Sequence, residues 1–264
     1  MRAVATWAAT VQALCNEGVI TLPRVRDAMV STDRANYCKP QTSVYQDSPQ
    51  RIGWGITISA PHMHARALEE LNEKLQPGST VLDVGSGSGF LTVAMSQLVG
   101  TDGKVVGIDH IPDLVVWSKT NVQRDGKQQL LDSGAIELLV RDGFGGYPER
   151  GPYDAIHVGA APPSIPEALK QQLKPGGVLI LPVGPDGGEQ HFMRVTRTPD
   201  GNRFEEKRLF GVRYVPLCSA EKRKRPLHAV VIFCWSHACA TPSPLLTHDH
   251  PVCVIFDCSE LRDA

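Results

Sequence analysis

The spacing of hydrophobic and polar positions divides this chain into three regions. Apolar residues recur at helical intervals over 1–35, with a break at Gly18, and again over 65–75. Between them, the stretch 45–63 is rich in Pro, Gly, Ser and Gln, and we predict an ordered loop there that contains a short strand. Long loops in compact domains are often functional, so this stretch is a candidate part of a site.

From residue 79, short β-branched runs alternate with helical segments. We predict strands at 81–84, 105–108, 136–140, 153–158 and 178–183, and helices at 90–99, 114–123 and 165–173, the last ended by a Pro-Gly-Gly turn at 175–177. This alternation is typical of a parallel sheet with right-handed crossovers. The runs 191–197 and 204–215 flank a turn without space for a helix, which predicts a terminal antiparallel hairpin.

The composition narrows the class of protein. The 264 residues contain 42% hydrophobic and 21% charged residues, as globular proteins do, and the net charge is −1. A chain with so little net charge has no overall positive field for nucleic acid or anionic lipid, so we expect neither as a partner. No apolar run approaches the length of about 18 residues that a membrane span requires, so we expect no membrane partner either.

The cysteines and the first residues of the chain indicate the cellular compartment, and the last residues indicate an extension. Seven cysteines in 264 residues are too few for a disulfide scaffold, so we expect reduced thiols and a cytoplasmic protein. Thr6 and Thr10 interrupt the apolar start, which favours a helix over a signal peptide. The segment 226–264 has no clear period and lacks the short Cys-x2-Cys spacing of zinc knuckles, so we expect an atypical, unstructured or loosely packed extension without metal.

A glycine-rich turn at 85–89 joins the strand 81–84 to the next helix and indicates a nucleotide ligand. Glycine allows such a ligand to approach the backbone at the carboxyl end of a parallel sheet. Phe90 stands where the dinucleotide motif has its third glycine, and no phosphate-binding loop or basic cluster accompanies the turn. Asp109 ends the next strand, where an acidic residue accepts ribose hydroxyls. A nucleoside with an uncharged tail, such as S-adenosylmethionine, fits this pattern.

Two further aspartates are candidates for the same ligand. Asp83 could engage its amino-acid end, and Asp142, after the strand 136–140, could accept from the adenine amino group. Alternatively, both carboxylates cap neighbouring turns or helices.

Several segments resemble protein-L-isoaspartate (D-aspartate) O-methyltransferases from the first helix to about residue 225. They are 45–50, 57–65, the turn 83–90, 107–111, 153–160 and 214–217. The resemblance implies an α/β fold: a doubly wound, mostly parallel seven-stranded sheet of the class I S-adenosylmethionine-dependent methyltransferase type, with an antiparallel terminal hairpin. It implies a single domain at 1–225, made of helices and substrate loop (1–78), cofactor-binding core (79–188) and terminal hairpin (189–225).

The resemblance also implies an activity. A monomer would transfer a methyl group from S-adenosyl-L-methionine to the free carboxylate of L-isoaspartyl or D-aspartyl residues in damaged proteins and peptides, and so start their repair through a succinimide. The alternative is a catalytically weakened module of the same fold that binds S-adenosylmethionine or damaged peptides.

Ser59 is the residue that the resemblance places in the active site. Its hydroxyl can donate to a substrate carboxylate that is already ionised, so the reaction needs no general base. The residues expected to line the substrate channel are Ile58, Ala60, Pro61, His62, Met63 and His64. His62 and His64 could also hint at a metal, but no acidic or cysteine partner follows nearby, and we expect none.

The cofactor residues that the turn and the resemblance imply are spread over four segments. They are Asp83, Gly85, Ser86, Gly87, Ser88, Asp109, His110, Arg141, Asp142, Gly143, Cys218 and Arg223. Three of them depart from the family: Cys218 replaces a threonine, Arg223 a glutamine and Arg141 a glycine. A thiol is a poorer hydrogen-bonding group than a hydroxyl, so these changes bear on cofactor affinity.

Overall fold

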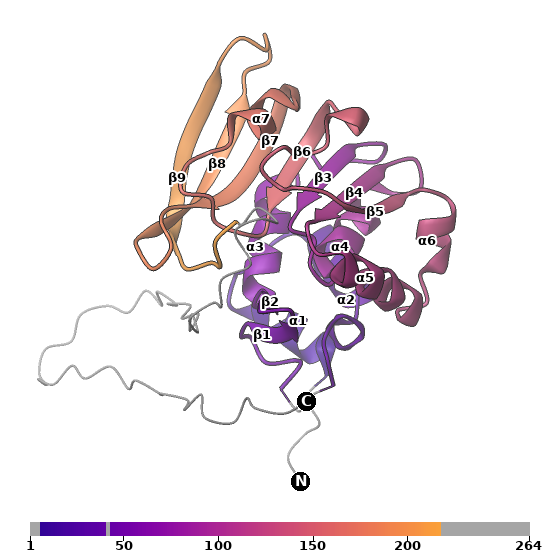
Figure 1. Cartoon of the computed structure of the whole chain (residues 1–264). Helices are drawn as coiled ribbons and strands as arrows, with labels where there is room; N and C mark the ends of the chain where they lie inside the picture. Colours follow the sequence, from indigo (N-terminus) through magenta and orange to yellow (C-terminus); the bar gives the residue numbers. More distant parts are fainter. Residues whose placement is uncertain (1–5, 41–42, 218–264) are drawn as a thin grey trace, which may run out of the picture. The chain divides into compact units, whose positions relative to one another are not determined.

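A seven-stranded sheet forms the centre of the computed structural model, which describes residues 6–40 and 43–217 (Figure 1). The strand order is β5-β4-β3-β6-β7-β8-β9, with β3 to β7 parallel and β8 and β9 antiparallel. The strands are β3 (Thr80–Val84), β4 (Lys104–Asp109), β5 (Ile136–Val140), β6 (Tyr153–Val158), β7 (Leu173–Val183), β8 (Gln190–Arg197) and β9 (Phe204–Val212). The mostly parallel sheet with its terminal hairpin is confirmed.

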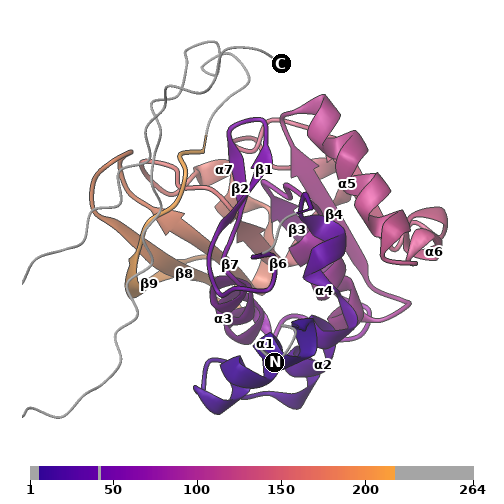
Figure 2. The same cartoon turned by 90° about the horizontal axis from the view of Figure 1, so that it is seen from below.

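Helices cover both faces of the sheet unequally. They are α1 (Trp7–Asn16), α2 (Pro23–Ser31), η1 (Arg34–Tyr37), α3 (Pro61–Leu71), α4 (Phe90–Val99), α5 (Pro112–Arg124), α6 (Gln128–Asp132), η2 (Pro148–Arg150) and α7 (Glu167–Gln171). The larger core packs side chains of α1 to α5 against one face of the sheet, and α7 contributes Leu169 to the core on the other face. In the view from below, α7 lies opposite α1, α2 and α3 (Figure 2).

Adjacent strand residues divide between the two cores. Val81 and Val105 belong to the larger core, whereas Leu82 and Val106 belong to the smaller one. Because successive side chains of a strand point to opposite faces, a strand covered on both sides is apolar throughout. This explains why these strands are continuous apolar runs in the sequence.

Two expectations about the elements need correction. The stretch 45–63 contains a two-stranded hairpin, β1 (Gln50–Gly53) and β2 (Ile56–Ile58), followed by the start of α3, where the sequence predicted one short strand within an ordered loop. The predicted helix 165–173 is also too long, because α7 ends at Gln171 and the buried Leu173 already pairs with Tyr153 in the sheet. The expected turn at 175–177 therefore lies inside β7, at an irregularity of its register.

The predictions for Cys218, Arg223 and the extension 226–264 lie outside the described residues. Within the described ranges, no helix is long and apolar enough to cross a membrane.

Candidate functional site

The glycine-rich turn 85–89 is held in place by β4 and α5. The N–H groups of Gly85 and Ser86 donate to the carbonyl of Ile108 at 2.8 and 3.0 Å, and the Asn121 side chain donates to the carbonyl of Ser88 at 3.0 Å. Gly89 precedes α4 with φ +85°, a conformation that favours glycine. These contacts fix the turn at the carboxyl end of the sheet, where β4 and β6 lie on either side of β3 and ligands of this fold class bind.

A cavity lies beside this turn, and we call it the turn-side cavity. It brings together five of the predicted cofactor residues, namely Asp83, Gly85, Ser86, Gly87 and Ser88. Its lining also includes Ile58, Ser59 and His64, which the sequence analysis placed on the substrate side. Thr57, Phe90, Leu91, His157 and Gly159 complete the lining, and sequence analysis assigned none of them to the site.

Asp83 is fixed beneath the turn by two side chains. It is 1% exposed, and its two carboxylate oxygens lie 2.8 Å from His157 Nδ1 and 2.6 Å from Thr92 Oγ1, whose hydroxyl donates to it. His157 comes from the end of β6, the strand beside β3. The position of His157 at a strand end next to the turn was the sequence signal that could have identified it.

Two buried polar atoms lining the turn-side cavity have no hydrogen-bond partner among the residues described. They are His64 Nδ1 and Ser86 Oγ. His64 is stacked on Phe90 with ring centroids 4.7 Å apart, and burial lowers its pKa well below 6.5, so the ring is neutral. Buried polar atoms of proteins are normally paired, so these two fit a ligand with hydrogen-bonding groups. The donor set therefore fits the amino-acid end of S-adenosylmethionine.

Asp109 lies at the end of β4, next to the turn, as its place in the sequence predicts. One of its carboxylate oxygens accepts from the N–H of Gly87 at 3.2 Å, and the other accepts from the N–H of Ile111 at 3.2 Å. His110 Nδ1 lies 3.5 Å from the same carboxylate. Asp109 therefore connects β4 to the turn, although neither it nor His110 is among the described residues that line the cavities.

The three predicted residues that follow β5 lie apart from the cavities in the described structure. Asp142 is exposed and accepts from the N–H of Phe144 at 3.0 Å, which is the turn-capping role of the alternative interpretation. The Arg141 guanidinium lies 5.2 Å from the centroid of the Tyr147 ring. Gly143 is buried, and a Cβ there would come within 2.8 Å of Val84. A role for them at the cofactor stays a prediction.

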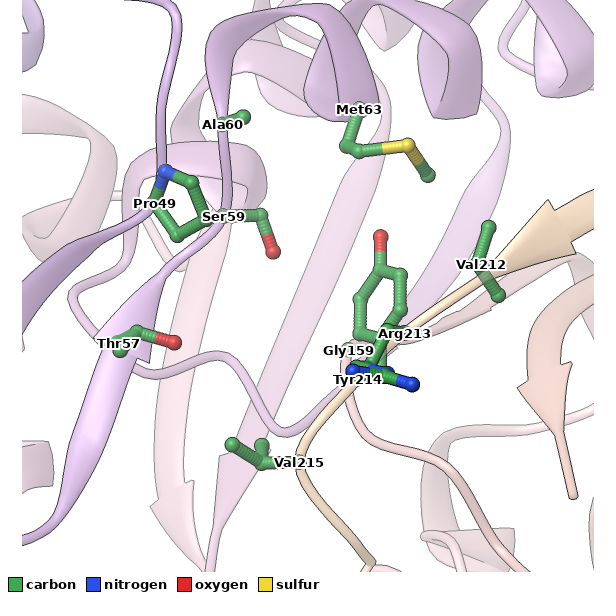
Figure 3. Close-up of a pocket in the computed structure, with 10 residues that line it drawn as sticks. All are labelled: Pro49, Thr57, Ser59, Ala60, Met63, Gly159, Val212, Arg213, Tyr214 and Val215. Carbon is green, nitrogen blue, oxygen red and sulfur yellow. The ribbon is translucent and has the colours of Figure 1, made fainter. Parts of the chain in front are cut away.

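A second cavity lies between the 45–63 segment and the end of β9, and we call it the loop-side cavity (Figure 3). In Figure 3 the Ser59 hydroxyl and the Met63 thioether point into the space that they share with Tyr214. Its lining comprises Pro49, Thr57, Ser59, Ala60, Met63, Gly159, Val212, Arg213, Tyr214 and Val215. Of the predicted substrate residues it contains Ala60 and Met63, whereas Pro61 and His62 are in neither described lining.

Asp47 attaches the loop to the start of α3. Its Oδ1 accepts from the N–H of His62 at 2.9 Å, and its Oδ2 lies 2.8 Å from His62 Nδ1. Burial acts to raise the pKa of Asp47, but the hydrogen bonds from His62 act in the other direction, and the pKa is lowered overall. His62 thus has an acidic partner that sequence analysis missed, because Asp47 is 15 residues away. Even so, no group of three metal-ligating side chains exists in the described part of the chain.

The two cavities share three lining residues, Thr57, Ser59 and Gly159. Gly159 leaves little space, since a Cβ there would lie 3.0 Å from the carbonyl oxygen of Gly85. Ser59 therefore stands in the wall between the two cavities. A ligand on the turn and a second molecule in the loop-side cavity would meet beside its hydroxyl.

Comparisons with known proteins agree with this arrangement. The sequence model of the family described as Protein-L-isoaspartate(D-aspartate) O-methyltransferase (PCMT) matches residues 6–222. A Protein-L-isoaspartate O-methyltransferase 1 from Arabidopsis thaliana is 46% identical over 82% of this chain and 93% of its own. A Protein-L-isoaspartate O-methyltransferase from Caenorhabditis elegans is 44% identical over 80% of this chain and 91% of its own.

A solved structure is similar over nearly its whole length. It is a protein from Plasmodium falciparum that is described as a putative protein-L-isoaspartate O-methyltransferase, crystallised in complex with S-adenosyl-L-homocysteine. The TM-score is 0.74 at 35% sequence identity, over 81% of this chain and 99% of that one.

Proposed function

Because the chain belongs to the protein-L-isoaspartate(D-aspartate) O-methyltransferase family, we propose that it methylates the free carboxylate of L-isoaspartyl or D-aspartyl residues. The methyl donor is S-adenosyl-L-methionine, and the ester starts repair of the damaged protein or peptide through a succinimide. The observation that carries the proposal is the position of Ser59 in the wall between the turn-side and loop-side cavities.

The turn-side cavity is the proposed cofactor site. The backbone of Gly85 and Gly87 would approach the nucleoside, while His64 Nδ1 and Ser86 Oγ would gain the hydrogen-bond partners that they lack among the described residues. S-adenosyl-L-methionine supplies a methyl group on a sulfonium, which is an electrophile. This assigns His64 to the cofactor side, whereas Ile58, Ala60, Pro61, His62 and Met63 remain the proposed substrate residues. Asp83, Ser88, Asp109, His110, Arg141, Asp142, Gly143, Cys218 and Arg223 complete the proposed cofactor residues.

The methyl transfer depends on the placement of the carboxylate and the methyl group more than on acid–base catalysis. A carboxyl group with an ordinary pKa near 4 is ionised at neutral pH and can attack the methyl group directly. Holding the nucleophile and the methyl carbon in line can lower such a barrier by up to about 7–11 kcal/mol. The Ser59 hydroxyl would contribute by donating a hydrogen bond that orients the carboxylate.

The lining of the loop-side cavity suits substrates of varied sequence. Ala60, Gly159 and Val215 are small or apolar and offer mainly backbone groups to a bound chain. Backbone hydrogen bonds recognise the extra main-chain methylene of an isoaspartyl residue without selecting its neighbours. The proposed partners are therefore damaged proteins in general. We further propose that residues 1–225 form the catalytic domain and that the protein is a cytoplasmic monomer.

The test is transfer of labelled methyl from S-adenosyl-L-methionine by the full chain to an isoaspartyl peptide and to its normal aspartyl twin. Transfer to the isoaspartyl peptide alone is the expected result. Transfer to both peptides would overturn the proposed specificity. Cofactor binding in calorimetry without any transfer would favour the alternative, a binding module of the same fold.

A further inference from the structure

A buried arginine lies behind the loop that carries Ser59. Arg34, the first residue of η1, is 0% exposed. Its Nε donates to the carbonyl of Val44 at 3.0 Å, Nη1 to the carbonyl of Ser59 at 2.8 Å, and Nη2 to the carbonyl of Ser48 at 3.2 Å. One planar guanidinium thus joins three points of the segment 44–59.

The charge of this side chain is maintained in the interior. Burial lowers the pKa of Arg34 to about 10, with opposing contributions from the Cys38 thiol and from Asp47, so the group is protonated at neutral pH. Within the described residues, no carboxylate lies within ion-pair distance of it. Burying a cation is costly, and here the three carbonyls offset the loss of water. An apolar side chain in the same space would leave these three carbonyls without their donor, so the guanidinium is what holds the segment 44–59 at three points.

The hydrogen bond to Ser59 fixes the direction of the next peptide group. The Ser59–Ala60 peptide is trans, so its carbonyl and its N–H point in opposite directions. Because the carbonyl points inward to Arg34, the N–H of Ala60 points the other way, and it has no acceptor among the described residues. Ala60 also lines the loop-side cavity and immediately precedes α3.

We propose that Arg34 is a positioning residue for Ser59. By holding the Ser59 carbonyl, it directs the Ser59 hydroxyl and the Ala60 N–H toward the substrate carboxylate in the loop-side cavity. This inference rests on the proposed function, because it assumes that the carboxylate binds there.

Arg24 provides a matched control. It also donates to backbone carbonyls, those of Leu75 at 2.6 Å and Leu98 at 2.8 Å, and to Asn72. It is absent from the described lining of both cavities. Arg24→Lys therefore removes a comparable set of hydrogen bonds without touching the site.

The experiment is a double-mutant cycle on the full chain with Arg34→Lys, Ser59→Ala and the double variant, with Arg24→Lys beside them. Lysine keeps the charge but cannot span three carbonyls. We expect both lysine variants to lower Tm. Arg34→Lys alone should lower kcat for an isoaspartyl peptide, by about 10-fold or more, while the Kd for S-adenosyl-L-homocysteine changes less than about 3-fold. In the Ser59→Ala background, the loss of kcat caused by Arg34→Lys should be smaller, about 3-fold or less, because only the orientation of the Ala60 N–H is then affected.

Two outcomes would overturn the inference: an unchanged kcat for Arg34→Lys, or the same fold-loss with and without the Ser59 hydroxyl. If Arg34→Lys does not fold, Arg34→Gln enters the same cycle with the same criteria. A wild-type chain that methylates no isoaspartyl peptide would instead refute the proposed function, so the two failures are distinguishable.

Discussion

His64 shows how burial decides the charge of a single side chain. Its folded-state pKa lies well below 6.5 because of burial, with Arg34, His157 and His62 adding positive charge around it. Below pH 6.5 the unfolded chain binds a proton at this position and the folded chain does not, so stability is lost as the pH falls. At pH 5.5 the loss amounts to at most about 1.4 kcal/mol, the limit for a folded chain that binds no proton at this position. His64→Phe keeps a ring against Phe90 and removes this titration.

The measurement is urea unfolding of the wild type and of His64→Phe at pH 7.5 and 5.5. The wild type should lose more stability than the variant over this interval, by up to about 1.4 kcal/mol, since other titrating groups cancel in the comparison. An equal loss in both proteins would show that His64 is protonated in the folded state.

The residues that the sequence predicted and those that it missed differ in the range of their contacts. The turn and Ser59 belong to short continuous motifs, and the structure brings Ser59 and most of the turn to one cavity. His157 and Arg34 act through partners 74 and 25 residues away, and such pairs depend on the tertiary fold. His64 lies beside the glycine turn and not among the predicted substrate residues for a related reason. The α3 N-terminus turns its side chain toward the glycine turn, whereas neighbouring Met63 faces the loop-side cavity.

At the scale of elements, Gly107 is where β4 meets the turn and α4. A Cβ at this position would lie 2.7 Å from Leu138, 3.0 Å from Ser86 Cβ and 3.1 Å from Thr92. Gly107→Ala should therefore lower the free energy of unfolding by about 1–3 kcal/mol. It should also weaken S-adenosyl-L-homocysteine binding, because Ser86 has to move.

Gly211→Ala in β9 is the control, since a Cβ there meets nothing within 4 Å among the described atoms. It should change stability by less than about 0.5 kcal/mol and leave binding unaltered. Chemical denaturation and calorimetry of both variants give the comparison. If the two alanine variants have the same stability and the same affinity, the close approach at Gly107 does not support the turn.

Several element boundaries were predicted correctly. The runs 136–140 and 153–158 have the predicted ends, because each is rich in apolar residues and is flanked by glycine, proline or charged residues. The prediction failed around Leu173, whose apolar character fits a helix end and a strand start equally well. Its pairing with Tyr153 decides the outcome, and no local pattern encodes that contact. The five-residue helix α6 was likewise missed, since it buries none of its side chains fully.

For the whole molecule, the turn-side cavity joins segments near residues 57–64, 83–91 and 157–159. A ligand bound there should stabilise the folded chain as a unit. At 100 times its Kd, S-adenosyl-L-homocysteine should add about 2.7 kcal/mol. For a chain of this size that corresponds to a rise in Tm of roughly 5–10 °C. Scanning calorimetry with and without the ligand measures it, and free methionine serves as the control. No rise at a saturating concentration would contradict the assignment of the cavity.

Gly159 has a consequence in genetics. It borders both cavities, and a Cβ there would come 3.0 Å from the backbone oxygen of Gly85. Every missense mutation of a glycine codon adds at least a Cβ, so a single nucleotide change at this codon alters both binding surfaces together. Recovery would then require compensation on two sides at once. We expect such alleles to lose activity and to have few second-site suppressors, in contrast to alleles that affect one cavity.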